Sequence, residues 1–268
     1  MEINLTYNED CLLTMARMPD EFIDLTVTSP PYDNLREYLG YSFDFESVAK
    51  ELFRVTKKGG VVVWVVGDAT INGSETGTSF KQALYFKEIG FNLHDTMIYV
   101  KNTSAFPSIG RYEQIFEYMF ILSKNKPKAI NLIKDKKNRW AGTSNFGERT
   151  NRQQDGKLKK TGKTIVNEFG IRTNVFRYNT GYGYTTKDKI AFQHPATFPE
   201  QLATDHIYSW SNEGDLVYDP FGGSGTTAKA CILLNRKYIL SEISAEYCQL
   251  AEKRIFPYKR QKDLFYDK

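Results

Sequence analysis

Near the C-terminus the chain reads Asp219-Pro220-Phe221-Gly222-Gly223-Ser224-Gly225-Thr226-Thr227-Ala228, and the short apolar run Leu216–Asp219 leads into it. The stretch contains a Gly-x-Gly-x-x-Ala pattern, whose glycines permit a tight strand-to-helix turn and the close approach of a nucleotide. The next predicted strand, Tyr238–Glu242, ends in an acid 17 residues after Gly225, where a carboxylate can bind ribose hydroxyls. Together these features predict a nucleotide-binding unit, although a tight turn without a ligand also fits the glycines alone.

The rest of the chain alternates short apolar runs with amphipathic segments. Strands are expected at 23–28, 61–66, 92–101, 113–123, 216–219 and 238–242, and helices at 42–56, 78–88, 199–210, 226–234 and 245–255. The first of these helices is expected to stop at Lys57-Lys58-Gly59-Gly60, because cations and glycine suit a helix C-terminus. Val61–Val66 is a continuous β-branched run, typical of a central parallel strand. Strands alternating with helices predict an α/β fold with a parallel-rich sheet covered on both faces.

Composition excludes several classes of protein. The chain has 268 residues, of which 41% are hydrophobic, 25% charged and 14% aromatic, as in one elaborated globular α/β unit or a core plus an insert. No membrane span is expected because no apolar stretch nears about 18 residues, and no signal peptide is expected because the start, Met1–Leu5, has neither a basic nor an apolar region. The histidines have no metal-site spacing, so no metal is predicted. A reducing cytoplasm is expected because the cysteines are few and scattered, at Cys11, Cys231 and Cys248.

Charge is distributed unevenly along the chain. The formal net charge is +4, but residues 124–189 hold 17 Lys/Arg and 5 Asp/Glu, which is +12 locally and leaves −8 for the remainder. The same stretch loses hydrophobic periodicity and interleaves its charges with aromatic side chains such as Trp140 and Tyr182. Cations suit phosphates and flat rings suit bases, so the stretch is predicted to bind nucleic acid. A solvated loop region is the alternative that fits the charge alone.

A second motif, Thr28-Ser29-Pro30-Pro31-Tyr32, follows the predicted strand 23–28, and ligand chemistry gathers at the carboxyl ends of parallel strands. The prolines fix the backbone and lack N–H groups, so the carbonyls of Ser29 and Pro30 remain rigid acceptors that can orient the amino group of a base. Tyr32 offers a ring for stacking on an extruded base. Taken alone, the pentapeptide also fits a rigid loop end.

With this motif first, a basic insert next and the glycine-rich stretch last, the chain resembles the β-class amino methyltransferases of DNA over nearly its whole length outside 124–190. The resemblance implies a Rossmann-like methyltransferase sheet in circularly permuted order. Residues 1–123 would form the catalytic half, 124–190 the target-recognition insert and 191–268 the S-adenosylmethionine-binding half. It also implies S-adenosylmethionine as cofactor, S-adenosylhomocysteine as product, and no metal.

The resemblance assigns roles residue by residue. It places Asp10 and the Cys11 backbone at the adenine ring, Glu242 at the ribose, and His194–Glu200 on the methionine side. The full cofactor set is Asp10, Cys11, His194, Pro195, Thr197, Phe198, Pro199, Asp219, Phe221, Gly222, Gly223, Ser224, Gly225, Thr226 and Glu242. The catalytic set is Ser29, Pro30, Pro31 and Tyr32. The candidate DNA-binding residues of the insert are Arg139, Lys157, Lys159, Lys160, Lys163, Arg172 and Arg177.

Ser29 bears on which base is methylated. In the family that the chain resembles, serine at this position usually accompanies cytosine N4 and aspartate adenine N6, so cytosine N4 is predicted and adenine N6 is the alternative. The lone pair of either amine is delocalised into the ring, so the enzyme must turn the nitrogen toward sp³ character and in line with the sulfonium methyl. The Ser29 hydroxyl and the Pro30 carbonyl are the candidates for this task. No cysteine follows a proline, so the Pro-Cys nucleophile of a C5-cytosine methyltransferase is absent.

The expected partner is double-stranded DNA, whose target base is flipped out, in a bacterial, archaeal or phage-encoded setting. The same loop chemistry also allows an RNA or a glutamine side chain as the substrate. A further alternative is a catalytically silent protein that keeps the fold and binds DNA. The sequence leaves open the recognition sequence, a homodimer and an accompanying restriction endonuclease.

Overall fold

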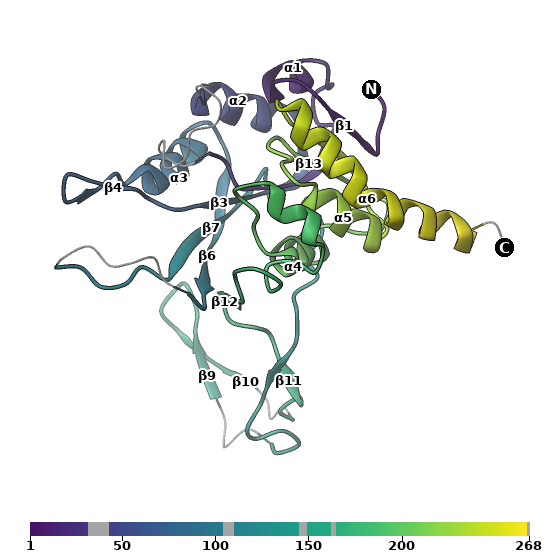
Figure 1. Ribbon diagram of the computed structural model, residues 1–268. Helices are drawn as coiled ribbons and strands as arrows, with labels where there is room; N and C mark the ends of the chain where they lie inside the picture. Colours follow the sequence, from purple (N-terminus) through teal and green to yellow (C-terminus); the bar gives the residue numbers. More distant parts are fainter. Residues whose placement is uncertain (32–42, 104–109, 145–148, 162–164, 267–268) are drawn as a thin grey trace. The chain divides into compact units, whose positions relative to one another are not determined.

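Two compact units make up the chain in the computed structural model, which describes residues 1–31, 43–103, 110–144, 149–161 and 165–266 (Figure 1). The larger unit comprises Met1–Asn131 and Asn174–Lys268, and the smaller comprises Leu132–Thr173. Two of the predicted site residues, Tyr32 and Lys163, lie outside the described residues.

An eight-stranded sheet forms the centre of the larger unit, in the order β1-β14-β13-β2-β3-β7-β6-β12. All neighbouring strands are parallel except that β7 runs antiparallel to both β3 and β6. The predicted parallel-rich sheet is therefore confirmed. Its strands are β1 (Leu5–Tyr7), β2 (Ile23–Thr28), β3 (Thr56–Val66), β6 (Asn92–Lys101), β7 (Phe116–Ser123), β12 (Val175–Tyr178), β13 (Leu216–Asp219) and β14 (Lys237–Ser241).

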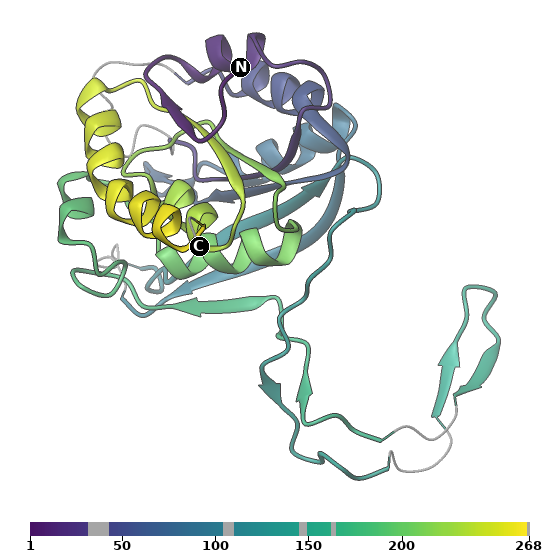
Figure 2. The same cartoon turned by 90° about the vertical axis from the view of Figure 1, so that its right-hand side faces the viewer.

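Helices cover both faces of this sheet, with α1–α3 on one side of the strands and α4–α6 on the other (Figure 2). In β3, Val62, Trp64 and Val66 pack into one core cluster with α1–α3. The alternating residues Val61 and Val63 point to the opposite face and are equally buried. The helices are α1 (Cys11–Ala16), α2 (Phe45–Val55), α3 (Thr78–Glu88), η1 (Lys189–Gln193), α4 (Glu200–Trp210), α5 (Thr226–Leu233) and α6 (Ala245–Tyr266).

The junction between α2 and β3 differs from the sequence prediction. The backbone is already extended at Thr56 (φ −72°, ψ 128°), so Lys57–Gly60 belong to β3 and do not form a helix C-terminus. A Cβ atom at Gly60 would lie 3.0 Å from the carbonyl oxygen of Asp24 on the neighbouring strand. The glycine is therefore needed where two backbones approach closely, a requirement that a single sequence does not display.

A strand inside the expected insert 124–190 joins the main sheet. Val175–Tyr178 forms β12, which pairs in parallel with β6 at the sheet edge. Phe176 and Tyr178 are buried, whereas Val175 and Arg177 are exposed. The candidate DNA-binding residue Arg177 thus lies in the larger unit, because a four-residue strand draws its stability from a partner that the local pattern does not reveal.

Helix α6 extends beyond its expected end at residue 255. It runs through Pro257 to Tyr266, and the hydroxyl of Tyr258 donates a hydrogen bond to Asp188 Oδ1 at 2.9 Å. A proline removes one backbone hydrogen bond from a helix, and contacts such as this one hold the following turn in place.

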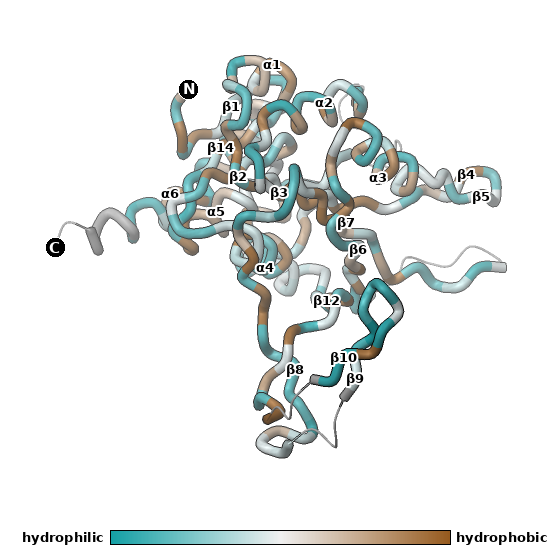
Figure 3. The backbone as a smooth tube through the Cα atoms, turned by 180° about the vertical axis from the view of Figure 1, so that it is seen from behind, coloured by the Kyte–Doolittle hydropathy of each residue, from teal (hydrophilic) through white to brown (hydrophobic). Residues whose placement is uncertain are grey.

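Short antiparallel ladders complete the described structure. The smaller unit contains β8 (Lys136–Lys137) with β11 (Phe169–Gly170), and β9 (Arg149–Arg152) with β10 (Leu158–Thr161). Hydrophilic residues occupy most of the β9–β10 hairpin (Figure 3). In the larger unit, β4 (Thr70–Ile71) and β5 (Ser74–Glu75) form a further hairpin. Within the part of the chain that the structure describes, no helix is both long and apolar enough to cross a membrane.

Candidate active site

The candidate site lies at the carboxyl edge of the sheet. The parallel strands β1, β14, β13 and β2 all end at this edge, and their register places Tyr7 beside Ser241. Ser29 and Glu242 each follow directly from the end of a strand, and Asp219 is the last residue of its own. Predicted catalytic and cofactor residues from distant parts of the chain are therefore brought to one edge, where α/β sheets bind ligands.

Asp219 connects the end of β2 to the glycine-rich turn. Its buried carboxylate accepts hydrogen bonds from the hydroxyls of Thr28 at 2.7 Å and Thr227 at 2.6 Å, and from the Phe221 N–H at 3.1 Å. Burial raises the pKa of Asp219, and these hydrogen bonds offset the rise only in part. The carboxylate thus accepts hydrogen bonds from protein donors, and it connects the end of β2 to the predicted cofactor loop.

Two glycines allow the loop to pack against the protein itself. Gly225 has a left-handed backbone (φ +78°), and a Cβ atom there would lie 3.0 Å from the Cβ of Ala251 on α6. A Cβ atom at Gly222 would lie 2.9 Å from the Cβ of Leu240 on β14. These glycines are therefore required by the close packing of the loop against helix α6 and strand β14.

The Glu242 carboxylate binds the loop through backbone N–H groups. Gly223 N–H donates to Oε2 and Ser244 N–H donates to Oε1, both at 2.9 Å. Burial raises the pKa of Glu242, and the hydrogen bonds from Ser244 and Gly223 partly counter this. An ionised carboxylate has about four acceptor sites, so the oxygens keep the capacity to accept ribose hydroxyls.

The N-terminal turn contacts the same acid. Asn8 Nδ2 donates to the carbonyl oxygen of Glu242 at 3.0 Å, and exposed Asp10 caps α1 by accepting the Leu12 N–H at 2.7 Å. Burial raises the pKa of the Cys11 thiol to about 12, so this thiol stays protonated at neutral pH.

The segment predicted for the methionine side runs from His194 to Glu200. The His194 ring lies against the loop, since a Cβ atom at Gly223 would be 3.1 Å from its Nε2. Pro195 is exposed and Phe198 half-buried. The Thr197 hydroxyl donates to a backbone carbonyl of η1 at 3.2 Å, and buried Pro199 precedes α4.

Beyond β2, the structure describes the predicted catalytic motif as far as Pro31. Thr28 is fully buried, Pro30 is buried, and Ser29 and Pro31 are half-buried. The Thr28 hydroxyl bond to Asp219 holds the base of this segment beside the loop.

Aromatic rings surround Phe221 of the loop, and sequence reasoning did not assign them to the site. Phe43 meets Phe221 edge to face at 5.3 Å between ring centroids, and Trp64 of β3 lies 6.4 Å from the same ring. The buried Trp64 indole N–H donates to Gln82 Oε1 at 2.8 Å, which fixes its ring. The signal available in the sequence was the single tryptophan inside an otherwise β-branched strand.

The comparisons with known proteins agree with this geometry. A family model described as DNA methylase, of the N6/N4 type, matches residues 23–253, which is most of the chain. The chain belongs to the DNA methylase family. The orphan methyltransferase M.BamHII of Bacillus amyloliquefaciens is 63% identical over 237 residues, covering 88% of this chain and 89% of that protein.

Two solved structures share the fold of this DNA methylase. One is entitled PvuII DNA methyltransferase (cytosine-N4-specific) and matches with a TM-score of 0.66, 22% identity and coverage of 95% of this chain and 91% of that one. The other is a DNA modification methylase from Thermus thermophilus complexed with S-adenosyl-L-methionine, with a TM-score of 0.63, 20% identity and coverage of 95% and 93%. The expected methyltransferase fold is therefore confirmed, and family membership makes DNA the substrate.

The predicted DNA-binding residues of the methylase are divided between its two units. Arg177 belongs to the larger unit, and the smaller holds Arg139, Lys157, Lys159, Lys160 and Arg172. The Arg139 guanidinium lies over the exposed Trp140 ring, 5.3 Å from its centroid. Arg172 pairs with Asp135, so part of its charge is balanced within the unit.

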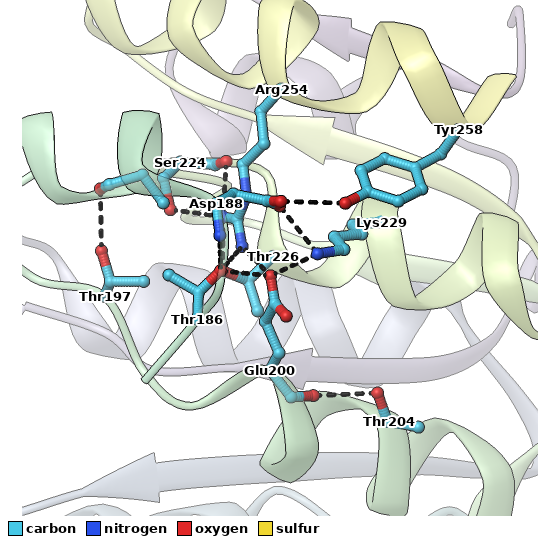
Figure 4. A network of polar contacts seen from close by, with 11 residues as sticks. Thr186, Asp188, Thr197, Glu200, Thr204, Ser224, Thr226, Lys229, Arg254 and Tyr258 are labelled. Carbon is cyan, nitrogen blue, oxygen red and sulfur yellow. Dashed lines mark hydrogen bonds and ion pairs between the residues drawn. The ribbon is translucent and has the colours of Figure 1, made fainter. Parts of the chain in front are cut away.

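Sequence reasoning missed a buried ionic cluster beside the loop. Arg254 and Lys229 face the carboxylates of Asp188 and Glu200 (Figure 4). A detectable signal was Lys229, a single cation inside the apolar helix 226–233. Among the described residues, no three or more His, Cys, Asp or Glu side chains gather in a way that could hold a metal ion.

Proposed function

We propose that this DNA methylase transfers a methyl group from S-adenosylmethionine to the N4 amine of cytosine in double-stranded DNA. The observation that carries the proposal is the position of Ser29, which follows β2 beside the cofactor loop and is anchored there through the Thr28–Asp219 hydrogen bond of 2.7 Å. A serine rather than an aspartate at this point of the motif supports cytosine N4 as the target.

The residues at the carboxyl edge fit S-adenosylmethionine. Glu242 has acceptor capacity for ribose hydroxyls, and exposed Asp10 offers a carboxylate for an adenine amino group. Phe221 and the rings around it provide an apolar wall, and the His194–Pro199 segment lies against the loop on the methionine side. The bound cofactor supplies a methyl group on a positively charged sulfur, with a neutral thioether as leaving group.

Ser29 and Pro30 would orient the target amine. The hydroxyl oxygen of Ser29 and the carbonyl oxygen of Pro30 accept hydrogen bonds from the amine N–H groups, which draws the nitrogen toward sp³ character and aims its lone pair at the methyl carbon. Prolines at positions 30 and 31 keep this backbone rigid. No covalent enzyme intermediate is needed.

The target amine must leave the duplex to reach this edge. We expect the methylase to flip the base, with Tyr32 stacking on it, and expect residues 124–190 to read the surrounding sequence. The exposed lysines of the β9–β10 hairpin suit phosphate contacts, so binding should weaken steeply with salt.

The test is transfer of labelled methyl from S-adenosylmethionine to mixed-sequence duplex DNA, followed by nucleoside mass spectrometry. N4-methylcytosine is the expected product. N6-methyladenine would overturn the assignment of the base while leaving the reaction class, and no incorporation into DNA would overturn the proposed reaction.

A matched variant tests the role of Ser29. Ser29→Ala should lower kcat roughly ten- to a hundredfold, as expected for the loss of one hydrogen bond made at the reacting amine. Binding of S-adenosylhomocysteine, measured by calorimetry, should remain unchanged and serves as the control for an intact site. A Ser29→Ala variant with full turnover would remove this residue from the mechanism.

A further inference from the structure

Arg254 of α6 is a fully buried cation next to the cofactor loop. Its side chain is 0% exposed, so its N–H groups have no access to bulk water and must be satisfied by protein acceptors. A buried guanidinium is costly unless it is both paired and hydrogen-bonded. The acceptors that it uses therefore indicate what it holds in place.

One side of the guanidinium donates hydrogen bonds to the loop itself. Nη1 donates to the carbonyl oxygen of Ser224, to the Ser224 hydroxyl and to the Thr226 hydroxyl, each at 2.9 Å (Figure 4). Both residues are 4% exposed; Ser224 directly follows Gly223, and Thr226 is the first residue of α5. Removing the guanidinium would leave the Ser224 carbonyl buried without this donor.

The other side holds the segment that leads to the methionine-side residues. Nη2 pairs with Glu200 Oε1 at 2.5 Å, and Nε pairs with Asp188 Oδ2 at 3.1 Å. Glu200 is the first residue of α4, directly after Pro199, and its carboxylate also accepts the Thr186 hydroxyl at 2.5 Å. One guanidinium thus joins the two chain segments that flank the predicted methionine end of the cofactor.

Lys229 balances the charge of the cluster without binding the loop through its side chain. Its Nζ lies 2.7 Å from Asp188 Oδ2 and 2.7 Å from Glu200 Oε1, and 4.6 Å from the centroid of the Tyr258 ring. Two cations and two carboxylates make the cluster neutral. Burial alone would raise the pKa of Asp188, but hydrogen bonds from Lys229, Arg254 and Tyr258 outweigh it and lower that pKa.

From these contacts we infer that Arg254 is a positioning residue for the cofactor. It holds Ser224 and Thr226 of the loop in fixed relation to the segment 186–200, so that both sides of the methionine-binding region are formed before the cofactor arrives. Preorganisation of this kind reduces the ordering cost of binding. The inference rests on the proposed use of S-adenosylmethionine.

The test compares two variants that each remove one interaction of the same cluster. Arg254→Lys keeps the positive charge but cannot reproduce the forked donors, whereas Lys229→Met removes a charge that does not contact the loop. S-adenosylhomocysteine binding is measured by calorimetry, KM for S-adenosylmethionine and kcat by methyl transfer to duplex DNA, and stability by urea unfolding.

Arg254→Lys should weaken S-adenosylhomocysteine binding by about tenfold or more, equivalent to roughly 1.4 kcal/mol, and raise KM in proportion while kcat changes less. Lys229→Met should unfold at lower urea concentration, yet bind S-adenosylhomocysteine within about twofold of the parent protein. Arg254→Met removes the guanidinium and its charge together and should weaken S-adenosylhomocysteine binding further. If Arg254→Met does not fold, the affinity of Arg254→Lys alone tests the inference.

Two results would overturn the inference. One is Arg254→Lys with unchanged affinity for S-adenosylhomocysteine. The other is an equal loss of affinity in Lys229→Met, which would show that cluster stability alone matters. A parent protein that binds no S-adenosylhomocysteine would instead refute the proposed function.

Discussion

Replacing Thr28 with valine should remove the hydrogen bond that anchors the loop to β2 and leave the rest of that strand unchanged. Thr28→Val preserves the shape of the side chain but removes the hydroxyl that donates to buried Asp219 at 2.7 Å. Asp219 would retain its hydrogen bonds from Thr227 and the Phe221 N–H. The end of β2 would then have lost its side-chain hydrogen bond to Asp219, at the start of the predicted cofactor loop.

The magnitude follows from the chemistry of the lost bond. A hydrogen bond to a charged group contributes about 1.5–3 kcal/mol, and valine leaves no cavity, so Thr28→Val should cost about 2 kcal/mol of unfolding free energy. For a chain of this size that corresponds to a fall of roughly 4–8 °C in Tm. Losing one donor also raises the pKa of Asp219 further, so the cost should be largest at neutral pH and shrink as the carboxylate becomes protonated.

Thr26 supplies a matched control on the same strand. Its hydroxyl oxygen is buried and has no hydrogen-bond partner among the described residues, so Thr26→Val should be neutral within about 0.5 kcal/mol or stabilising. Urea unfolding of both variants gives the comparison. A double-mutant cycle of Thr28→Val with Asp219→Asn should yield a coupling of about 1–2 kcal/mol.

The reasoning would be refuted if Thr28→Val cost no more than Thr26→Val, or if the cycle showed no coupling. Either outcome would mean that the loop is held by other interactions and that stability gains nothing from the contact of 2.7 Å between Thr28 and Asp219.

Three further predictions concern groups elsewhere in the fold. Burial lowers the pKa of His206 to about 3 from 6.5, so unfolding takes up a proton and the free energy of unfolding should fall by roughly 1.4 kcal/mol per pH unit below pH 6.5. Urea unfolding of His206→Phe should show a weaker dependence of this free energy on pH. An equal pH dependence in the two proteins would contradict the lowered pKa of His206. Gly225→Ala should destabilise the protein by about 1–3 kcal/mol, because φ at this position is +78° and the new Cβ would lie 3.0 Å from the Cβ of Ala251. Thermal unfolding measures this, and an unchanged Tm would count against the close packing of Gly225 on Ala251. Burial raises the pKa of Cys11 and Cys248 to about 12, so iodoacetamide at pH 8 should alkylate both roughly a thousandfold more slowly in the native than in the unfolded protein, as mass spectrometry can measure; rapid native alkylation would show that these thiols are accessible.

Local patterns predicted the elements with strong periodicity or clear punctuation. The strand Leu216–Asp219 agrees with the prediction at both ends, and the helix after the glycine turn begins at Thr226 as expected. A continuous apolar run and a glycine turn are properties of neighbouring residues, so they can be recognised without the rest of the fold. Short strands such as β1 and β12 were missed because their pairing partners lie far away in the sequence.

The candidate site was predicted only in part. The motifs at Ser29–Pro31 and Asp219–Thr226 do lie at one edge of the sheet. The rings around Phe221 and the contacts of Arg254 were not predicted, because a lone aromatic or basic residue inside a strand or helix has no distinctive local pattern.

Element order, motif chemistry and charge distribution were sufficient to predict an α/β fold with a nucleotide-binding turn and a basic insert. The resemblance of its motifs to the DNA amino methyltransferases implied a methyltransferase whose catalytic half precedes its cofactor half. Folding determined which side chains meet, as in the bond between Thr28 and Asp219 across 191 positions and the joining of loop and α4 by Arg254. The physical reason is that hydrogen bonds and ion pairs act over a few ångströms in space. The residues that satisfy a buried carboxylate or guanidinium are therefore known only once the sheet has brought distant strands and helices together.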